Sequence, residues 1–228
     1  MRLRSASILA SVFVVATCGL VHELLAATLA SYVLGNSVRQ YALVIGLYLS
    51  AMGVGALLSR RVSTGLARWF VGVELALALV GGLSVPALHL LFGHLATFGP
   101  ALYSVVFAIG VMVGTELPLL MRLLDDDLSF RELVSRSLLA DHIGSLAAAL
   151  LFPLALVPYV GLLRTGVLVG LCNAAVALWG AWFLRGSLGR ASTPLRVAGV
   201  LVALTLAAAW RLSPLVEAHA ERAMDAVG

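Results

Sequence analysis

Four acidic residues stand within or at the ends of long apolar stretches of the sequence: Glu23, Glu74, Glu116 and Asp141. An ionised carboxylate at the centre of a membrane-spanning helix costs on the order of 2.5–3.5 kcal/mol. Acids in such positions are expected to face one another, a water-filled cavity or cationic partners. The four acids are therefore the candidate contacts for a positively charged ligand.

The composition indicates the solvent that surrounds these acids. The 228 residues are 61% hydrophobic and 11% charged, and the mean hydropathy is +1.05. Because lipid offers no partners to backbone polar groups, only helices and closed barrels cross a membrane. The apolar runs are continuous over about 20 residues or more, which is the length of a spanning helix. The sequence therefore predicts an all-α, polytopic helical bundle in a lipid bilayer.

Charged residues and Gly or Pro breaks separate seven apolar runs, and each run predicts a transmembrane helix. The runs lie near 7–33, 40–59, 69–92, 100–123, 138–158, 163–184 and 195–212. We expect a transmembrane domain over 1–212 and a short C-terminal tail over 213–228. The first run is longer than the apolar core of a signal peptide, which favours a retained helix.

The arginines predict the orientation, since the sequence contains no lysine. Most of them precede the first run or fall between runs two and three, four and five, or six and seven. The arginines on the other side are Arg39, Arg164, Arg211 and Arg222. The positive-inside rule then places the N-terminus in the cytoplasm of a multi-pass inner (plasma) membrane protein. Seven spans put the C-terminus outside, unless the seventh run does not insert.

Local context connects three of the acids with helix packing. Glu74 and Asp141 share their helix faces with small residues, so both are expected to point at neighbouring helices. Glu116 lies two residues before Pro118, and a proline inside a helix leaves one carbonyl oxygen without its usual donor. An acid beside a broken helix is a recurrent arrangement at the cation sites of transporters.

Small residues at helical spacing predict where helices approach one another closely. The expected rows are Gly46, Ser50 and Gly53 on the second run, Gly110 and Gly114 on the fourth, and Gly166, Gly170, Asn173, Ala177 and Gly180 on the sixth.

The four acids are expected at different depths in the membrane. Glu23 lies in the outer half, and the other three acids lie in the cytoplasmic half. Arginines are expected near both groups: Arg122 and Arg136 on the cytoplasmic side, and Arg39 and Arg164 on the outer side. Two interpretations follow. Either the acids pair with these arginines and hold the bundle together, or they line a polar pathway or cation site.

Few other motifs suggest chemistry. The connection 124–137 is expected to be a short interfacial helix capped by Ser129, or a solvated loop. Its three aspartates, residues 125–127, lack the ligand spacing of a metal site. Cys18 and Cys172 are expected to be small core residues without a disulfide. No nucleotide, hydrolase or zinc motif occurs, so we predict no cofactor and no metal, and the dispersed arginines do not predict nucleic-acid binding.

Four stretches resemble, in order, the N-terminal transmembrane domain of bacterial fused spermidine synthases, the polyamine aminopropyltransferase family. They are VHELLAATLASYVLGNSVRQYALVIGLYLSAMGVGALLSRR at 21–61, FVGVELALALVGGLSVP at 70–86, VGTELPLLMRLL at 113–124 and ADHIGSLAAALLFPLALVPYVGLLRTG at 140–166. The resemblance covers nearly all of 15–185, and each of the four acids falls within a matched stretch.

In that family a soluble Rossmann-like domain follows the membrane region and carries the catalytic aspartate. The present sequence contains no such positions, so the resemblance implies no catalytic residue and no enzymatic activity for this chain alone. It implies a membrane protein that binds or passes a polyamine or similar organic cation. The alternatives are a membrane anchor or assembly subunit for a separate soluble aminopropyltransferase, and a half-size major-facilitator-like transporter that forms a homo-oligomer.

Overall fold

A computed structural model describes residues 2–92, 94–124 and 129–225 of the chain, and this part is helical throughout, without a strand. The helices are α1 (Arg2–Leu34), α2 (Ser37–Ser59), α3 (Leu66–His89), α4 (Leu95–Leu124), α5 (Phe130–Leu151), α6 (Leu162–Phe183), α7 (Arg185–Leu188) and α8 (Ser192–Asp225). A π-helix, Phe152–Val160, continues α5, and a 3-10 turn, Gly189–Ala191, leads into α8. Seven helical segments are long and apolar enough to cross a membrane. The predicted all-α bundle is confirmed.

Two boundaries differ from those expected. The fifth helix begins at Phe130, because Ser129 caps it: the Ser129 hydroxyl accepts from the Glu132 amide at 3.5 Å and donates to its carboxylate at 2.9 Å. The predicted cap at Ser129 is confirmed, and the helix that it starts runs directly into the fifth span. At the other end of the chain, α8 continues past residue 212 to Asp225. The three aspartates at 125–127 lie outside the described residues.

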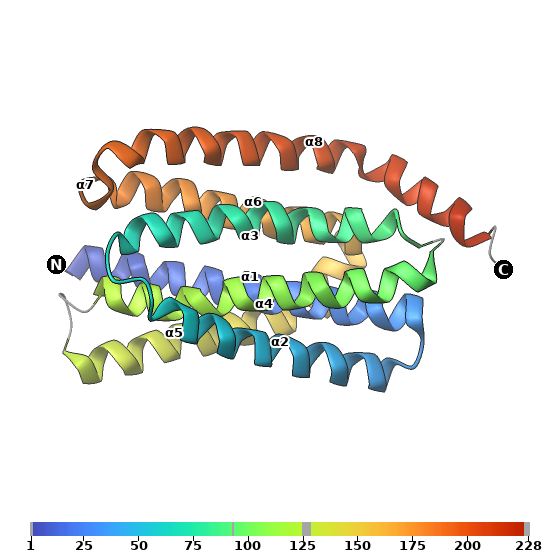
Figure 1. The fold of residues 1–228 in the computed structure, drawn as a ribbon, viewed down its shortest axis with the longest axis horizontal. Helices are drawn as coiled ribbons and strands as arrows, with labels where there is room; N and C mark the ends of the chain where they lie inside the picture. The colour runs from blue at the N-terminus through green and yellow to red at the C-terminus, as the bar shows by residue number, and fades with distance from the viewer. Residues whose placement is uncertain (1, 93, 125–128, 226–228) are drawn as a thin grey trace.

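The long helices run side by side along the long axis of the molecule (Figure 1). The most extensive contacts join α3 to α6, α2 to α4 and α1 to α5, while α8 packs along the outer side of α6 and α3. The start of α1 and the end of α8 lie at opposite ends of the bundle, as an odd number of spans requires.

Glycines bring α2 and α4 into backbone contact. A Cβ atom placed on Gly114 would lie 2.5 Å from the Met52 Cα atom, and one on Gly110 would lie 2.8 Å from the Ala51 Cβ atom. The expected row on the fourth run therefore does pack. The row of Gly46, Ser50 and Gly53 on α2 does not: all three are exposed and both glycines face open space. The packing face of α2 lies one residue further round the helix, at Ala51 and Gly55.

The small-residue row on α6 packs inside the bundle as predicted, since all five of its residues are buried, and the structure shows that α3 is the partner of its glycines. A Cβ atom on Gly170 would lie 2.6 Å from the Gly82 Cα atom and 2.7 Å from the Ala78 carbonyl oxygen. Because only hydrogen stands between these two backbones, the α3–α6 pair depends on glycine at both positions.

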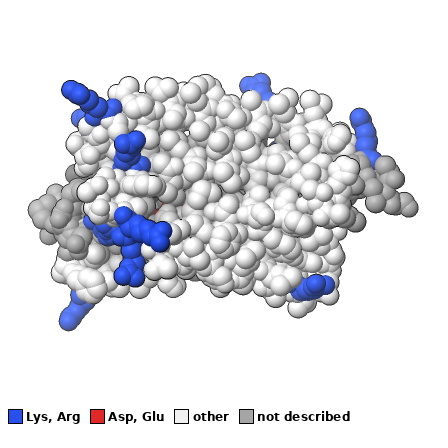
Figure 2. Space-filling view, in the orientation of Figure 1, with Lys and Arg blue, Asp and Glu red and all other residues white. Residues whose placement is uncertain are grey.

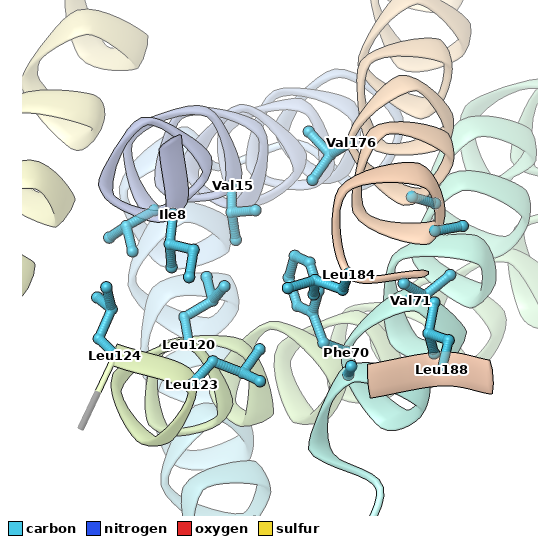
Figure 3. Packing of buried hydrophobic residues seen from close by; sticks show 14 of the residues in the cluster. Ile8, Val15, Phe70, Val71, Leu120, Leu123, Leu124, Val176, Leu184 and Leu188 are labelled. Carbon is cyan, nitrogen blue, oxygen red and sulfur yellow. The ribbon is translucent and has the colours of Figure 1, made fainter. Parts of the chain in front are cut away.

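Apolar side chains fill the bundle at the end that holds the N-terminus (Figure 3). Ile8 and Val15 of α1 face Leu120 of α4, and the Phe70 ring of α3 lies beside Leu184, at the end of α6. The same end carries most of the exposed arginines visible in Figure 2. A cluster of buried apolar side chains therefore forms the core of the bundle near its arginine-rich end.

Candidate functional site

Glu74 on α3 and Glu116 on α4 form the most buried acidic pair of the described chain. Their exposed fractions are 0% and 1%, and the two carboxyl groups are close enough to interact electrostatically. Apart from each other, the two carboxyl groups have no hydrogen-bond partner within the described residues. Buried polar atoms are almost always satisfied in folded proteins. Two adjacent buried carboxyl groups that receive no donor from any other described residue are therefore an exception, and a ligand could supply that donor.

A cavity of about 310 Å³ lies next to this pair, between α1, α2, α4 and α5. Its wall is mostly apolar, with Val12, Met52 and Val113 among the lining residues, and it holds two acids, Glu116 and Asp141. Glu116 thus belongs both to the buried pair and to the cavity wall. The structure therefore places two of the four predicted site residues on this cavity, and a third, Glu74, beside one of them.

Asp141 is more exposed than Glu74 and Glu116. Its side chain is 34% exposed, and one carboxylate oxygen lies 3.8 Å from the Nδ1 atom of His142, too far for a hydrogen bond. That ring nitrogen instead lies 2.7 Å from the Leu138 carbonyl oxygen. Asp141 therefore has no strong local partner that would prevent its carboxylate from contacting a ligand in the cavity.

The cavity also contains a backbone acceptor. Pro118 has no amide hydrogen, so the carbonyl oxygen of Gly114, four residues earlier, lacks its helical donor. Both residues line the cavity, close in sequence to Glu116. Pro118 does not break the helix, because α4 continues without interruption to Leu124, so the expected broken helix beside Glu116 is wrong. The lining of the cavity therefore combines the Gly114 backbone with the carboxyl groups of Glu116 and Asp141.

Tyr48 is a buried polar residue that interacts electrostatically both with Glu116 and with the fourth acid, Glu23. Its ring is 2% exposed, and its hydroxyl donates to the Gly19 carbonyl oxygen at 2.8 Å. Sequence reasoning missed Tyr48, because a single tyrosine in an apolar run has no spacing that distinguishes it from a core residue.

Glu23 lies in the C-terminal half of α1, does not line the cavity, and is 7% exposed. It makes no hydrogen bond or ion pair within the described part of the chain. Two arginines, Arg39 and Arg164, were expected near it, and Arg164 donates instead to the Ser213 hydroxyl at 2.9 Å and lies 5.9 Å from the centre of the Trp210 ring.

The arginines at the other end are also engaged elsewhere. Arg122 donates to the carbonyl oxygens of Ser59, at 3.2 Å, and Val62, at 2.6 Å, and so caps the end of α2. Arg136 pairs with Glu132 at 3.2 Å. The interpretation that the buried acids pair with these arginines is therefore wrong for Glu74 and Glu116.

Further polar residues lie inside the bundle. The ring of His22 is buried against Gly81, and neither ring nitrogen has a partner among the described residues. Cys18 and Cys172 are free thiols, the first buried and the second exposed. No group of three or more His, Cys, Asp or Glu side chains within the described ranges is placed to hold a metal ion.

Comparison with known proteins gives curated relatives of one kind. The chain is 49% identical to the polyamine aminopropyltransferase of Leptospira interrogans over 174 residues, which is 76% of this chain and 35% of that protein. It is 51% identical to polyamine aminopropyltransferase 2 of Ralstonia nicotianae over 189 residues, or 81% and 37% of the two chains. For polyamine aminopropyltransferase 2 of Streptomyces coelicolor the identity is 39% over 233 residues, or 95% and 41%.

No protein-family model and no solved structure matches the chain. The comparison with known proteins therefore rests on these relatives alone. The match covers most of this chain but well under half of each relative. The resemblance inferred from the four quoted stretches is confirmed at this level. The chain is a membrane-type helical bundle that matches one part, 35–41% of the length, of proteins named polyamine aminopropyltransferase.

Proposed function

We propose that this chain is a membrane domain that binds or passes a polyamine or similar organic cation, with Glu74, Glu116 and Asp141 as its contacts. The observation that carries the proposal is the pair of buried carboxyl groups that have no described hydrogen-bond partner apart from each other, beside a cavity whose wall holds a third carboxylate. The names of the relatives supply the class of cation, because each is called a polyamine aminopropyltransferase.

Electrostatics favours a ligand of this kind. Ionised carboxylates side by side in a low-dielectric interior repel one another, whereas an ammonium group between them is attracted to both. A polyamine carries several ammonium groups joined by flexible methylene chains, which suits acids separated by apolar wall. The volume of about 310 Å³ is at the lower end of the range of small-molecule sites.

Glu23 enters the proposal as a second, outer contact. Tyr48 interacts with both Glu23 and Glu116, so its buried hydroxyl connects the outer acid to the cavity region. A cation that moves between the two halves of the bundle would exchange one carboxylate for another along this line. We place the pathway in the inner membrane, with the arginine-rich end in the cytoplasm, on the positive-inside rule.

A second candidate function is that of a membrane anchor or assembly subunit for a separate soluble aminopropyltransferase. The observation that favours it is the similarity to proteins named polyamine aminopropyltransferase, of which the chain matches 35–41% of the length. The exposed small-residue row on α2 would equally serve a homo-oligomer, as a half-size transporter requires.

The test is spermidine binding to the purified protein in lipid nanodiscs, measured by isothermal titration calorimetry. Glu74→Gln, Glu116→Gln and Asp141→Asn are each expected to weaken binding at least about tenfold, because each removes one charge at the site. Glu132→Gln is the matched control, since Glu132 is exposed and pairs with Arg136 outside the cavity.

Thermal unfolding of each variant separates the alternatives. If the three variants remain folded and bind spermidine as tightly as the unmodified protein, the proposed cation site is wrong. If they unfold at much lower temperature, the acids have a structural role instead. Copurification of a soluble aminopropyltransferase, unaffected by the three substitutions, would favour the anchor.

A further inference from the structure

A second hollow lies on the outside of the bundle, at the start of α3 and beside α8. Its volume is about 630 Å³, and its lining includes Thr64, Arg68, Trp69, Gly72, Val73 and Leu195. None of these residues lines the cavity that holds Glu116 and Asp141. We call this second hollow the α3–α8 groove.

The α3–α8 groove changes from polar to apolar along its length. Thr64 and Arg68 lie at the end where α3 begins, and Gly72, Val73 and Ala76 follow along the helix. Ala76 lies about 15 Å beyond the first residue of α3, at 1.5 Å for each residue. A groove with a charged mouth and an apolar floor has the polarity profile of one leaflet of a bilayer.

Two exposed side chains mark the level of the membrane surface. Trp69 is 55% exposed, and tryptophan is enriched where hydrocarbon meets head groups. Arg68 is exposed too, and its guanidinium group has no hydrogen bond or ion pair within the described ranges. Its charge is therefore available to a ligand outside the protein.

The described charge that lines the groove is positive. None of the lining residues that the structure describes is acidic, and Figure 2 shows blue side chains gathered at this end of the molecule with almost no red among the described residues of the visible face. Basic pockets between transmembrane helices near the membrane surface are suited to anionic lipid head groups. A free phosphate could contact the arginine, but it has no acyl chain to bury against the apolar residues of the groove.

We propose that the α3–α8 groove binds a phospholipid with an anionic head group, whose phosphate contacts Arg68 and whose acyl chain lies over Gly72 and Val73. This site is independent of the proposed cation site, since the two share no lining residue. A lipid held there would cover the contact between α3 and α8 at the membrane surface.

Gly72 offers a direct steric test. A Cβ atom at Gly72 meets no atom within 4 Å, so Gly72→Leu enters the groove without disturbing the packing of α3. Gly46→Leu on α2 is its matched control, because Gly46 is also exposed and also faces open space. For the charge, Arg68→Gln is compared with Arg131→Gln, an exposed arginine on α5 outside the groove.

Native mass spectrometry of the full chain, titrated with phosphatidylglycerol and with phosphatidylcholine, measures the binding. The unmodified protein is expected to prefer phosphatidylglycerol at least about fivefold. Arg68→Gln should remove that preference, and Gly72→Leu should weaken the binding of both lipids at least about fivefold. Neither control variant should change either affinity.

Three outcomes would overturn the proposal: no preference between the two lipids in the unmodified protein, lipid binding unchanged in Arg68→Gln and Gly72→Leu, or glycerol phosphate binding as tightly as phosphatidylglycerol. The last result would assign the site to a free phosphate ester. Glu116→Gln should leave lipid binding intact, so failure of the lipid site and failure of the cation site can be told apart.

Discussion

The contact between α2 and α4 provides the sharpest test of the bundle, through Gly114→Ala. A Cβ atom at this position would lie 2.5 Å from the Met52 Cα atom, and the Met52 carbonyl oxygen lies closer still. Because carbon atoms in ordinary contact are about 3.5–4.0 Å apart, the two helices would have to separate by about 1 Å. Overpacking of this kind costs about 1–3 kcal/mol.

Gly46→Ala on α2 is the control, since a Cβ atom there meets nothing within 4 Å. Alanine in the interior of an exposed helix is favoured over glycine by about 0.5–1 kcal/mol. The two substitutions are chemically identical and are expected to have opposite effects on the free energy of unfolding. The difference between them comes from tertiary packing alone.

Thermal unfolding of both variants in the same detergent measures the effect. For a chain of this size, 1 kcal/mol corresponds to about 2–4 °C in Tm, so Gly114→Ala should melt roughly 2–12 °C below the unmodified protein. Gly46→Ala should melt at the same temperature or slightly above it. If Gly114→Ala melts no lower than Gly46→Ala, the close approach of α2 and α4 is refuted.

Three further outcomes follow from single contacts. Tyr48→Phe removes the hydrogen bond to the Gly19 carbonyl and should lower the free energy of unfolding by about 0.5–1.5 kcal/mol; an unchanged Tm would argue against that bond. Ser129→Ala removes the cap of α5 and should lower the free energy of unfolding by about 0.5–2 kcal/mol, and Ser129→Asp should recover most of that loss. Hydrogen exchange of the first amides of α5 measures the effect, and equal exchange in the unmodified protein and both variants would contradict the cap. In the folded protein a membrane-permeant maleimide should modify the exposed Cys172 and spare the buried Cys18, as read by mass spectrometry; equal labelling would contradict their placement.

The number and type of the helices could be predicted because both depend on properties that accumulate along the chain. About 20 consecutive apolar residues form a spanning helix whatever their neighbours are, since the backbone must satisfy its own hydrogen bonds in lipid. The ends were less predictable. The fifth helix starts eight residues before its apolar run because the Ser129 and Glu132 cap stabilises a polar first turn.

Faces were predicted less well than lengths. On α6 every small residue of the expected row is buried and its three glycines contact α3, whereas on α2 the row at Gly46 and Gly53 is exposed. Small residues permit a close approach but do not attract a particular partner, and α2 carries small residues on two faces. Only the position of α4 selected the face with Gly55.

The acidic residues of the site likewise show which features the sequence predicts and which depend on the tertiary structure. Hydrophobic context alone identified Glu74, Glu116 and Asp141 as energetically exceptional, because the cost of a carboxylate depends on the apolar run around it. Whether arginines would neutralise them depended on the direction of long, flexible side chains, which no spacing reveals. In the structure Arg122 caps α2 and leaves Glu116 with no described hydrogen-bond partner apart from Glu74.

The sequence by itself therefore determined the membrane class, the seven helices and the identity of the exceptional carboxylates, because each follows from local hydrophobicity. Tertiary structure alone decided that Glu116 belongs both to a buried pair with Glu74 and to a cavity wall with Asp141. These three residues come from three consecutive helices, and their meeting depends on how backbones fit at glycines such as Gly114. Such a fit is a property of two surfaces together and cannot be read from either one alone.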